Sequence, residues 1–353
     1  MDAPTSFDPV HFIVLRFEGN KRSRTSTFLS SHRDYFPPVR IIEIPTLNDI
    51  RKAVRVIKSL PKSFPVLISS PNSLLVVLLL VLRKPRPILD AGWPLIDGVI
   101  SSRRQFGVFG LNLIKTYLID FIAFHYSRFV FLESVEQIKF VQSTFLVPQR
   151  KLSLLFTGFD ESRVLSDTSS EAVSVKPVKP YSVLFRGGAQ SEAGLQTLKE
   201  AMLILPKESD TRVIVISKGF LNSENSIDNL KVVDKELTDI ELFKEIRSCD
   251  VMLGQMSSHS RLKRTIPHKF FEAAFFCKPY VTSNTGVMGF FVKNQMVFGF
   301  KGGDPKSLAE VLNAALSDPE EMKRRASRLH GWYLENASQS ILMNRFRTEI
   351  EKL

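Results

Sequence analysis

The stretch from Cys249 to Asn284 constrains the fold of this chain more than any other part. It begins with a short apolar run at 250–253, bounded by polar residues, which predicts a buried strand. A polar, basic loop follows over 257–267. Residues 268–276 then have the composition of a short helix, with Pro267 suited to its first turn. Residues 278–284 form a second predicted strand, entered through Pro279. Strand, loop, helix and strand in this order make one βαβ unit.

The loop and helix of this unit carry charges that suggest a ligand. Units of this kind place ligands at the carboxyl ends of their strands and anions at helix N-termini. Arg261, Lys263 and Arg264 lie just before a helix that begins with Lys269 and carries Glu272. These side chains suit a diphosphate and a sugar hydroxyl. A solvated basic loop on an ordinary α/β unit is the alternative, and spacing alone favours neither.

The rest of the chain repeats the alternation of strands and helices, which predicts parallel sheets covered on both faces. At 353 residues the chain has room for two domains of ordinary size. Residues 166–180 are rich in Ser, Thr and Asp and end in two Val-Lys-Pro repeats, a composition typical of a linker. We therefore expect two doubly wound domains joined there. The second opens with a strand followed by the glycine turn Arg186-Gly187-Gly188.

Charge and hydropathy narrow the class of partner. Residues 1–150 hold 20 Lys and Arg against 11 Asp and Glu, an excess that suits nucleic acid, an anionic membrane surface or phosphorylated ligands. Nucleic acid is not expected, because there is no zinc spacing, helix-turn-helix signal or aromatic-basic alternation. The most apolar run, 74–82, is far shorter than the roughly 20 residues that a spanning helix needs and predicts a buried core helix.

Features at the start of the chain and the two cysteines bear on the compartment. Residues 1–9 are polar and acidic, so no signal peptide is expected. Cys249 and Cys277 have no metal spacing, and we expect both to be reduced core residues. Together these features favour a reducing compartment.

Several motifs, taken in order, resemble those of GT-B glycosyltransferases, and more narrowly the retaining family four (glycosyl transferases group 1), which uses nucleotide sugars. The resemblance covers most of the chain. The motifs that carry it are a helix, strand and Ser134 over 119–140, the strand and Gly158-Phe-Asp160 turn over 152–160, the strand and glycine turn over 183–195, the donor-site signature over 266–281, Gly303-Asp304-Pro with Leu308, and Asp318-Pro-Glu.

The resemblance implies a fold with two facing Rossmann-like domains and an active site in the cleft between them. It places the acceptor domain at 1–172 and the nucleotide-sugar donor domain at 178–331. The last helical stretch, from Asp318 to Leu353, is expected to break near Gly331. The resemblance also implies that a terminal helix, 332–353, returns to pack on the first domain.

The sequence departs from the family pattern at three positions. Arg264 stands where family members usually carry a Glu, eight residues before the one that matches Glu272. Gly188 and Ala193 stand where many members carry an Arg and a Lys that grip diphosphate. The resemblance then implies that cations come instead from Arg186 or from the basic residues of the 261–269 segment. These departures put the identity of the sugar in doubt, and activity to a lesser degree.

The candidate residues fall into three groups. The catalytic candidates are Asp90, Arg264 and Lys269, and the donor-binding candidates are Arg186, Gly187, Gly188, Lys263, Glu272 and Asn284. The candidates for acceptor or membrane contact are Lys21, Arg22 and Arg24. Asp90 is expected to end a strand that spans 86–90. Each group has a structural alternative: Asp90 could cap a turn, the glycines could form a plain turn, and 21–24 could be a solvated loop. No metal is expected, because no Asp-x-Asp pair is present.

From these observations we expect a glycosyltransferase that moves a sugar from a nucleotide-sugar donor to a glycan or lipid-linked acceptor. We expect retention of configuration, no metal or other cofactor, and a cytoplasmic protein peripheral to an anionic membrane surface. The first alternative is a catalytically inactive GT-B homologue that acts as a subunit or a sugar-binding module. The second is another GT-B enzyme such as an epimerase, for which the sequence shows no carboxylates and His at suitable strand ends.

Overall fold

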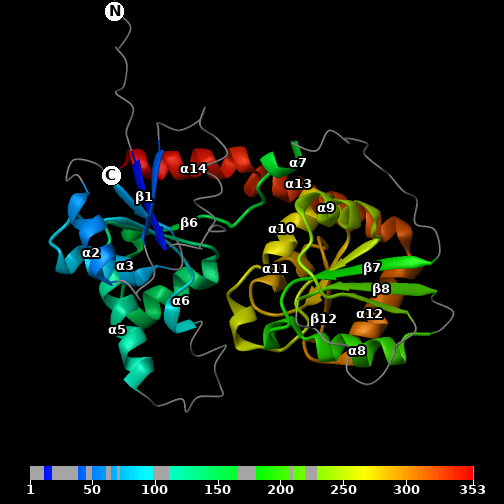
Figure 1. The fold of residues 1–353 in the computed structure, drawn as a ribbon. Coiled ribbons are helices and arrows are strands. Elements are labelled where there is room, and N and C mark those ends of the chain that lie inside the picture. Colours follow the sequence, from blue (N-terminus) through cyan, green and yellow to red (C-terminus); the bar gives the residue numbers. More distant parts are fainter. Residues whose placement is uncertain are drawn as a thin grey trace, which may run out of the picture. The chain divides into compact units, whose positions relative to one another are not determined.

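The computed structural model describes residues 12–17, 39–44, 50–60, 65–69, 72–97, 111–165, 180–206, 210–218 and 229–352. The chain divides into two compact units (Figure 1). Unit 1 comprises Met1–Phe156 together with Met343–Leu353, and unit 2 comprises Thr157–Leu342. The sequence predicted the division at 166–180, whereas it falls earlier, between Phe156 and Thr157. The segment that returns to unit 1 starts at Met343 rather than at residue 332.

Unit 1 is built on a parallel sheet with the strand order β2-β1-β3-β4-β5-β6. Its strands are β1 (Phe12–Phe17), β2 (Val39–Ile44), β3 (Val66–Ile68), β4 (Ile88–Gly92), β5 (Phe129–Leu132) and β6 (Leu152–Leu154). Its helices are α2 (Ile50–Ser59), α3 (Ser73–Val81), α5 (Leu111–Tyr126), α6 (Val135–Phe145) and most of α14 (Gln339–Glu351).

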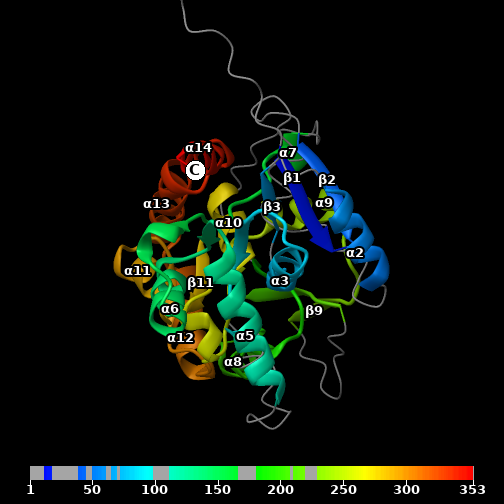
Figure 2. The ribbon, with the colours of Figure 1, turned by 90° about the vertical axis from the view of Figure 1, so that its left-hand side faces the viewer.

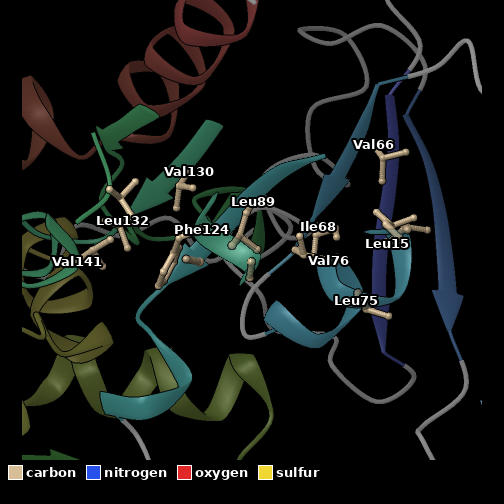
Figure 3. Close-up of a cluster of buried hydrophobic side chains, with 14 of the residues drawn as sticks. Leu15, Val66, Ile68, Leu75, Val76, Leu89, Phe124, Val130, Leu132 and Val141 are labelled. Atoms are coloured by element: carbon tan, nitrogen blue, oxygen red, sulfur yellow. The ribbon is translucent and has the colours of Figure 1, made fainter. Parts of the chain in front are cut away.

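The two faces of this sheet are covered by different helices. Val130 and Leu132 belong to a buried cluster with side chains of α2, α3, α5 and α6 (Figure 3). Phe129 and Phe131 alternate with them and therefore point to the opposite face. There the ring of Phe346, on α14, lies 5.2 Å from that of Phe131. The C-terminal segment is thus part of the packing of unit 1.

The apolar run at 74–82 forms α3, as predicted, and packs beside α5 (Figures 1 and 2). Leu75, Val76 and Leu79 are fully buried, whereas Val81 at its end is exposed. Throughout the described ranges, no helix combines the length and apolar character required to cross a bilayer.

Unit 2 is built on a second parallel sheet, with the order β12-β11-β10-β7-β8-β9. Numbered from β7 as the first strand, this is the order 3-2-1-4-5-6 of a dinucleotide-binding Rossmann sheet. Its strands are β7 (Tyr181–Arg186), β8 (Thr211–Ile216), β9 (Leu230–Val233), β10 (Val251–Leu253), β11 (Tyr280–Ser283) and β12 (Phe298–Phe300). The order reverses between β7 and β10, so these two neighbours form the topological switch point.

The helices of unit 2 are α7 (Ser162–Leu165), α8 (Leu195–Ile204), α9 (Asp239–Ser248), α10 (His268–Phe275), α11 (Met288–Lys293), α12 (Pro305–Ser317) and α13 (Pro319–Asn336). Some of them begin at side chains that cap them: Thr238 and Glu241 form a capping box at the start of α9, and Asp304 caps α12. The buried cluster of α8 and α12 includes Phe185 and Val281. Tyr280, on the opposite face of the sheet, packs on Phe270 of α10.

Two local predictions are wrong, and two short helices were not predicted. The terminal helical stretch does not break near Gly331, because α13 continues to Asn336 and the break falls at 337–338. Cys277 is exposed rather than in the core, although Cys249 is buried. The short helices α7 and α11 follow strands and carry no strong apolar period, and the sequence did not indicate them.

A hydrogen-bonded tie holds the two ends of unit 2 together. Glu161 Oε1 accepts from Tyr333 Oη at 2.8 Å and from Gln339 N at 2.9 Å. Gln339 Oε1 accepts from Glu161 N at 3.1 Å. The chain enters unit 2 shortly before Glu161 and leaves it shortly after Gln339. Both connections to unit 1 therefore begin beside this tie.

Candidate functional site

The candidate side chains of unit 2 gather at its topological switch point. Arg186 is the last residue of β7, and Gly187 and Gly188 follow it. Gln255 follows the neighbouring strand β10, and α10 begins at His268. In open α/β sheets, ligands bind outside the carboxyl ends of the strands at this point. The strand order therefore indicates a ligand site at this corner of the sheet, without help from any sequence motif.

Arg186 and Glu272, predicted as separate donor ligands, are paired with each other. Arg186 Nε donates to Glu272 Oε2 at 2.6 Å, and Nη2 donates to Oε1. Burial would raise the pKa of Glu272, but the charge of Arg186, assisted by His268, outweighs it and lowers this pKa to about 2. The carboxylate is therefore ionised at neutral pH although its side chain has no exposed surface.

His268 completes this cluster from the first turn of α10. Its Nδ1 lies 2.9 Å from Arg186 Nη2 and 3.3 Å from Glu272 Oε1. Arg186 can only donate and the Glu272 carboxylate can only accept, so the tautomer of His268 decides which of these two contacts of Nδ1 is a hydrogen bond. The side chain of His268 is 43 % exposed. It therefore offers a partly exposed polar group beside the buried pair.

Lys269 is a buried amine next to the glycine turn. It is 6 % exposed, and its Nζ lies 3.6 Å from the centroid of the Phe185 ring. Nζ donates to Gln255 Oε1 at 3.4 Å. Burial holds the pKa of Lys269 well below its usual range, and the neighbouring charge of Arg186 lowers it further. An anion placed beside Nζ would relieve this penalty, because opposite charge stabilises the protonated amine.

The absence of a side chain at Gly187 leaves the space beside this amine open. Gly187 has φ +144°, and a Cβ there would lie 3.4 Å from Lys269 Nζ. A Cβ at Gly188 would fall 2.4 Å from Gln190 Oε1. A larger residue at either position would therefore strain the backbone or crowd the neighbouring side chains.

Chemically, the corner combines the guanidinium of Arg186, the buried amine of Lys269, one ionised carboxylate and a helix N-terminus. Arg186 and Lys269 can donate to phosphate oxygens, and the N-terminus of α10 adds a partial positive charge. Glu272 only accepts hydrogen bonds, and because it is fully buried and both its oxygens accept from Arg186, a ligand hydroxyl reaches it only when one of these contacts opens. This arrangement suits a ligand that has both an anionic group and hydroxyls.

The remaining candidates of unit 2, the catalytic candidate Arg264 and the donor candidates Lys263 and Asn284, lie outside α10 and the glycine turn. Arg264 is half-buried and ends the short 3₁₀ helix Ser260–Lys263. Lys263 is exposed, and its carbonyl accepts from Val287 N at 3.2 Å, so this loop packs on the turn before α11. Asn284 follows β11, one strand beyond β10, and is exposed.

The candidates of unit 1 are described by themselves. The prediction that Asp90 ends its strand is wrong. Strand β4 continues to Gly92, and Asp90 has no exposed surface. Its backbone pairs with Phe131. Lys21, Arg22 and Arg24 lie outside the described residues, so their role stays a prediction.

Sequence reasoning missed Phe185, Gln255 and His268 as members of the site. Phe185 and His268 directly precede predicted ligands, and Gln255 lies two residues after the first strand of the βαβ unit at 249–284. Knowledge of the strand order would have indicated all three, because each lies near the switch point. Among the residues that the structure describes, no group of three or more His, Cys, Asp or Glu could hold a metal ion.

Comparisons with known proteins agree on the architecture. No protein-family model matches the sequence, and no curated protein matches it significantly. Solved structures do resemble it. HepE from Anabaena in complex with UDP-glucose has a TM-score of 0.72 at 13% identity, covering 97% of this chain and 100% of that one.

Two further structures give the same result. Sucrose-phosphate synthase from Thermosynechococcus elongatus has a TM-score of 0.71 at 11% identity, covering 97% and 98% of the two chains. WaaG, a glycosyltransferase involved in lipopolysaccharide biosynthesis, has a TM-score of 0.66 at 12% identity, covering 95% and 98%. With its two Rossmann-like units of six parallel strands each, the chain has the GT-B fold.

Proposed function

We propose that this protein is a glycosyltransferase that moves a sugar from a nucleotide-sugar donor to a glycan or lipid-linked acceptor. The buried Lys269, beside a side-chain-free Gly187 at the switch point of unit 2, is the observation that carries the proposal. A lysine is rarely buried unless it has a negative partner, and Glu272, the carboxylate whose charge acts on Lys269, is already paired with Arg186. A donor diphosphate would supply the missing charge. The structure of HepE with UDP-glucose, which shares the fold, supports this class of ligand.

In this proposal each residue of the corner has a defined task. Lys269 and the N-terminus of α10 bind the diphosphate and stabilise the negative charge that develops on it as the glycosidic bond to the sugar breaks. Such fixed charges act without a metal and lose no energy to reorganisation. Glu272 accepts hydrogen bonds from hydroxyls of the nucleotide ribose, while Arg186 keeps it ionised. Arg264 adds positive charge from the loop before α10. We also propose that the configuration of the sugar is retained, as the resemblance to family four implies.

We place the reaction at the cytoplasmic face of a membrane. The excess of cations in residues 1–150 supports reversible attachment to anionic lipid and gives no reason to expect nucleic acid. A lipid-linked acceptor would be presented at such a surface. Unit 1 would then receive the acceptor, with Lys21, Arg22, Arg24 and Asp90 as its candidate contacts.

A catalytically inactive homologue that acts as a subunit or sugar-binding module is the second candidate. Two observations favour it. Arg186 and Glu272 satisfy each other in the described structure. Arg264 also stands where the family pattern has a carboxylate that would accept from the donor sugar. Binding without turnover would identify this candidate.

Calorimetry with UDP-glucose and other nucleotide sugars tests donor binding directly. Lys269→Met keeps the bulk of the side chain and removes its charge, so we expect affinity to fall by about 1.5–3 kcal/mol, the worth of a hydrogen bond to a charged group. Lys244→Ala, an exposed position on α9, is the matched control and should bind normally. If Lys269→Met binds every donor as tightly as the wild type, the site is misassigned. Release of labelled sugar then separates an enzyme from an inactive module.

A further inference from the structure

A row of exposed apolar side chains runs along α5 of unit 1. Ile114 is 60 % exposed, Leu118 is 50 % exposed and Phe121 is 37 % exposed. Their spacing of four and three residues places them on one face of the helix. Large apolar residues that are exposed singly need no explanation, but an aligned row on one helix marks an interaction surface.

The row continues past the end of α6. The ring of Phe121 lies 4.4 Å from that of His125, and His125 Nε2 is hydrogen-bonded to Phe145 O at 2.8 Å. The next residue, Leu146, is 77 % exposed and holds a left-handed backbone conformation with φ 56°. We name Ile114, Leu118, Phe121 and Leu146 the α5 patch.

The opposite face of α5 is fixed in the core, so the α5 patch cannot be buried by a simple rotation of the helix. Asp120, Ala123 and Phe124 are fully buried. Tyr117 Oη donates to Thr144 O at 3.1 Å, which ties the helix to α6. Within unit 1, the first turns of α5 extend beyond the neighbouring helices (Figure 1).

Most acidic side chains that the structure describes between residues 12 and 156 are buried. Four of its acidic residues are buried, and they are Asp90, Asp97, Asp120 and Glu133. Between residues 12 and 156, the other acidic residues that the structure describes are Glu43 and Glu136. The cations Lys115, Arg128, Lys139 and Arg150 of the same range are exposed instead, and Lys115 follows Ile114 on α5 itself. The exposed surface of this range is therefore more basic than its full set of charges suggests.

We infer that the α5 patch docks unit 1 on an anionic lipid surface, an inference that rests on the proposed action at a membrane. A membrane interface offers the two environments that this helix matches: an apolar layer for Ile114 and Leu118, and anionic headgroups for the exposed Lys115 between them in the sequence. α5 lies in the interface and does not cross it.

The test is co-sedimentation of the whole chain with vesicles of phosphatidylglycerol and phosphatidylcholine. The double variant I114S/L118S removes two exposed side chains, and we expect its vesicle affinity to fall at least about tenfold, from the apolar area withdrawn from lipid. The double variant L203S/I204S is the matched control, because these residues are 74 % and 51 % exposed on α8 of unit 2. It should bind like the wild type. Binding should also weaken in high salt and on vesicles of phosphatidylcholine alone, because charge attraction is screened or lost.

The outcomes are distinct. Equal binding of I114S/L118S and wild type would overturn the inference. A wild-type dimer in sedimentation velocity that I114S/L118S dissociates would also overturn it, because a second copy would then cover the patch. Donor binding, measured on the same samples, should be unchanged in I114S/L118S. A chain that uses the patch on vesicles but binds no nucleotide sugar would refute the proposed function and leave this inference standing.

Discussion

Asp120 gives a quantitative test of the electrostatics inside unit 1. Its carboxylate is fully buried on α5, where Ser73 Oγ donates to Oδ1 at 2.9 Å and Ile96 N donates to Oδ2 at 2.8 Å. Burial, with a contribution from the charge of Asp97, raises the pKa of Asp120 from 3.8 to about 6 despite these hydrogen bonds. The folded protein therefore holds this proton more tightly than the unfolded chain does.

The sign and size of the effect follow from linkage. The stability associated with protonated Asp120 is fully present below pH about 4 and is lost as the pH rises through about 6. A shift of roughly two pKa units, at 1.36 kcal/mol per unit, corresponds to about 3 kcal/mol. Asp120→Asn keeps the shape, and its amide can donate to Ser73 Oγ while its carbonyl accepts from Ile96 N. We expect equal stability near pH 4 and a variant about 3 kcal/mol more stable near pH 7.5.

The two tryptophans of the chain allow this to be measured on one unit. Trp93 lies in unit 1 and Trp332 in unit 2, so a Trp332→Phe background leaves fluorescence that reports on unit 1 alone. Urea unfolding at several pH values then gives the free energy of unfolding with and without Asp120→Asn. Glu136→Gln, at a partly exposed position, serves as the control. Parallel pH profiles for Asp120→Asn and its background, or a less stable variant at neutral pH, would refute the reasoning.

Three further predictions concern unit 2. Burial lowers the pKa of Lys269, and a bound anion would raise it again, so donor binding should take up a proton and weaken as the pH rises. Calorimetry in buffers of different ionisation enthalpy measures the number of protons taken up. A value of zero would contradict this prediction. With a donor identified, Arg264→Glu and Arg264→Ala should each lower turnover by about 2.7–4 kcal/mol in activation free energy while unfolding is little changed; wild-type rates in either variant would reduce Arg264 to a solvated residue. Tyr333→Phe removes a hydrogen bond to the Glu161 carboxylate and should cost about 1.5–3 kcal/mol in urea unfolding, and an unchanged midpoint would show that the tie contributes nothing.

The sequence predicted the fold well where local chemistry decides an element. Helix α10 begins at His268, directly after Pro267, and α12 begins after Asp304 because a capping side chain and a proline coincide there. The parallel sheets followed from the alternation of elements. The break after α13 was misplaced because a glycine inside an exposed helix costs only about 1 kcal/mol, and Gly331 has open space around it.

The candidate site was predicted residue by residue but not as a set of contacts. Arg186 and Glu272 are 86 residues apart, and each was assigned to a ligand separately. Their pairing depends on β7 lying next to β10, a neighbour relation that spacing along the chain does not contain. For the same reason Asp90 was placed at a strand end, although β4 extends two residues further.

The return of the C-terminal segment has a consequence for how the protein is made. Phe346 packs on Phe131, so unit 1 includes residues from both ends of the chain, with unit 2 inserted between them. Domains generally fold in the order in which they leave the ribosome. Here unit 2 can complete its packing during translation, whereas unit 1, although its sheet is synthesised first, must wait for the last residues. Until then the face of its sheet that carries Phe131 lacks the cover of Phe346. A chain truncated before Met343 should therefore keep this apolar face exposed and remain bound to chaperones.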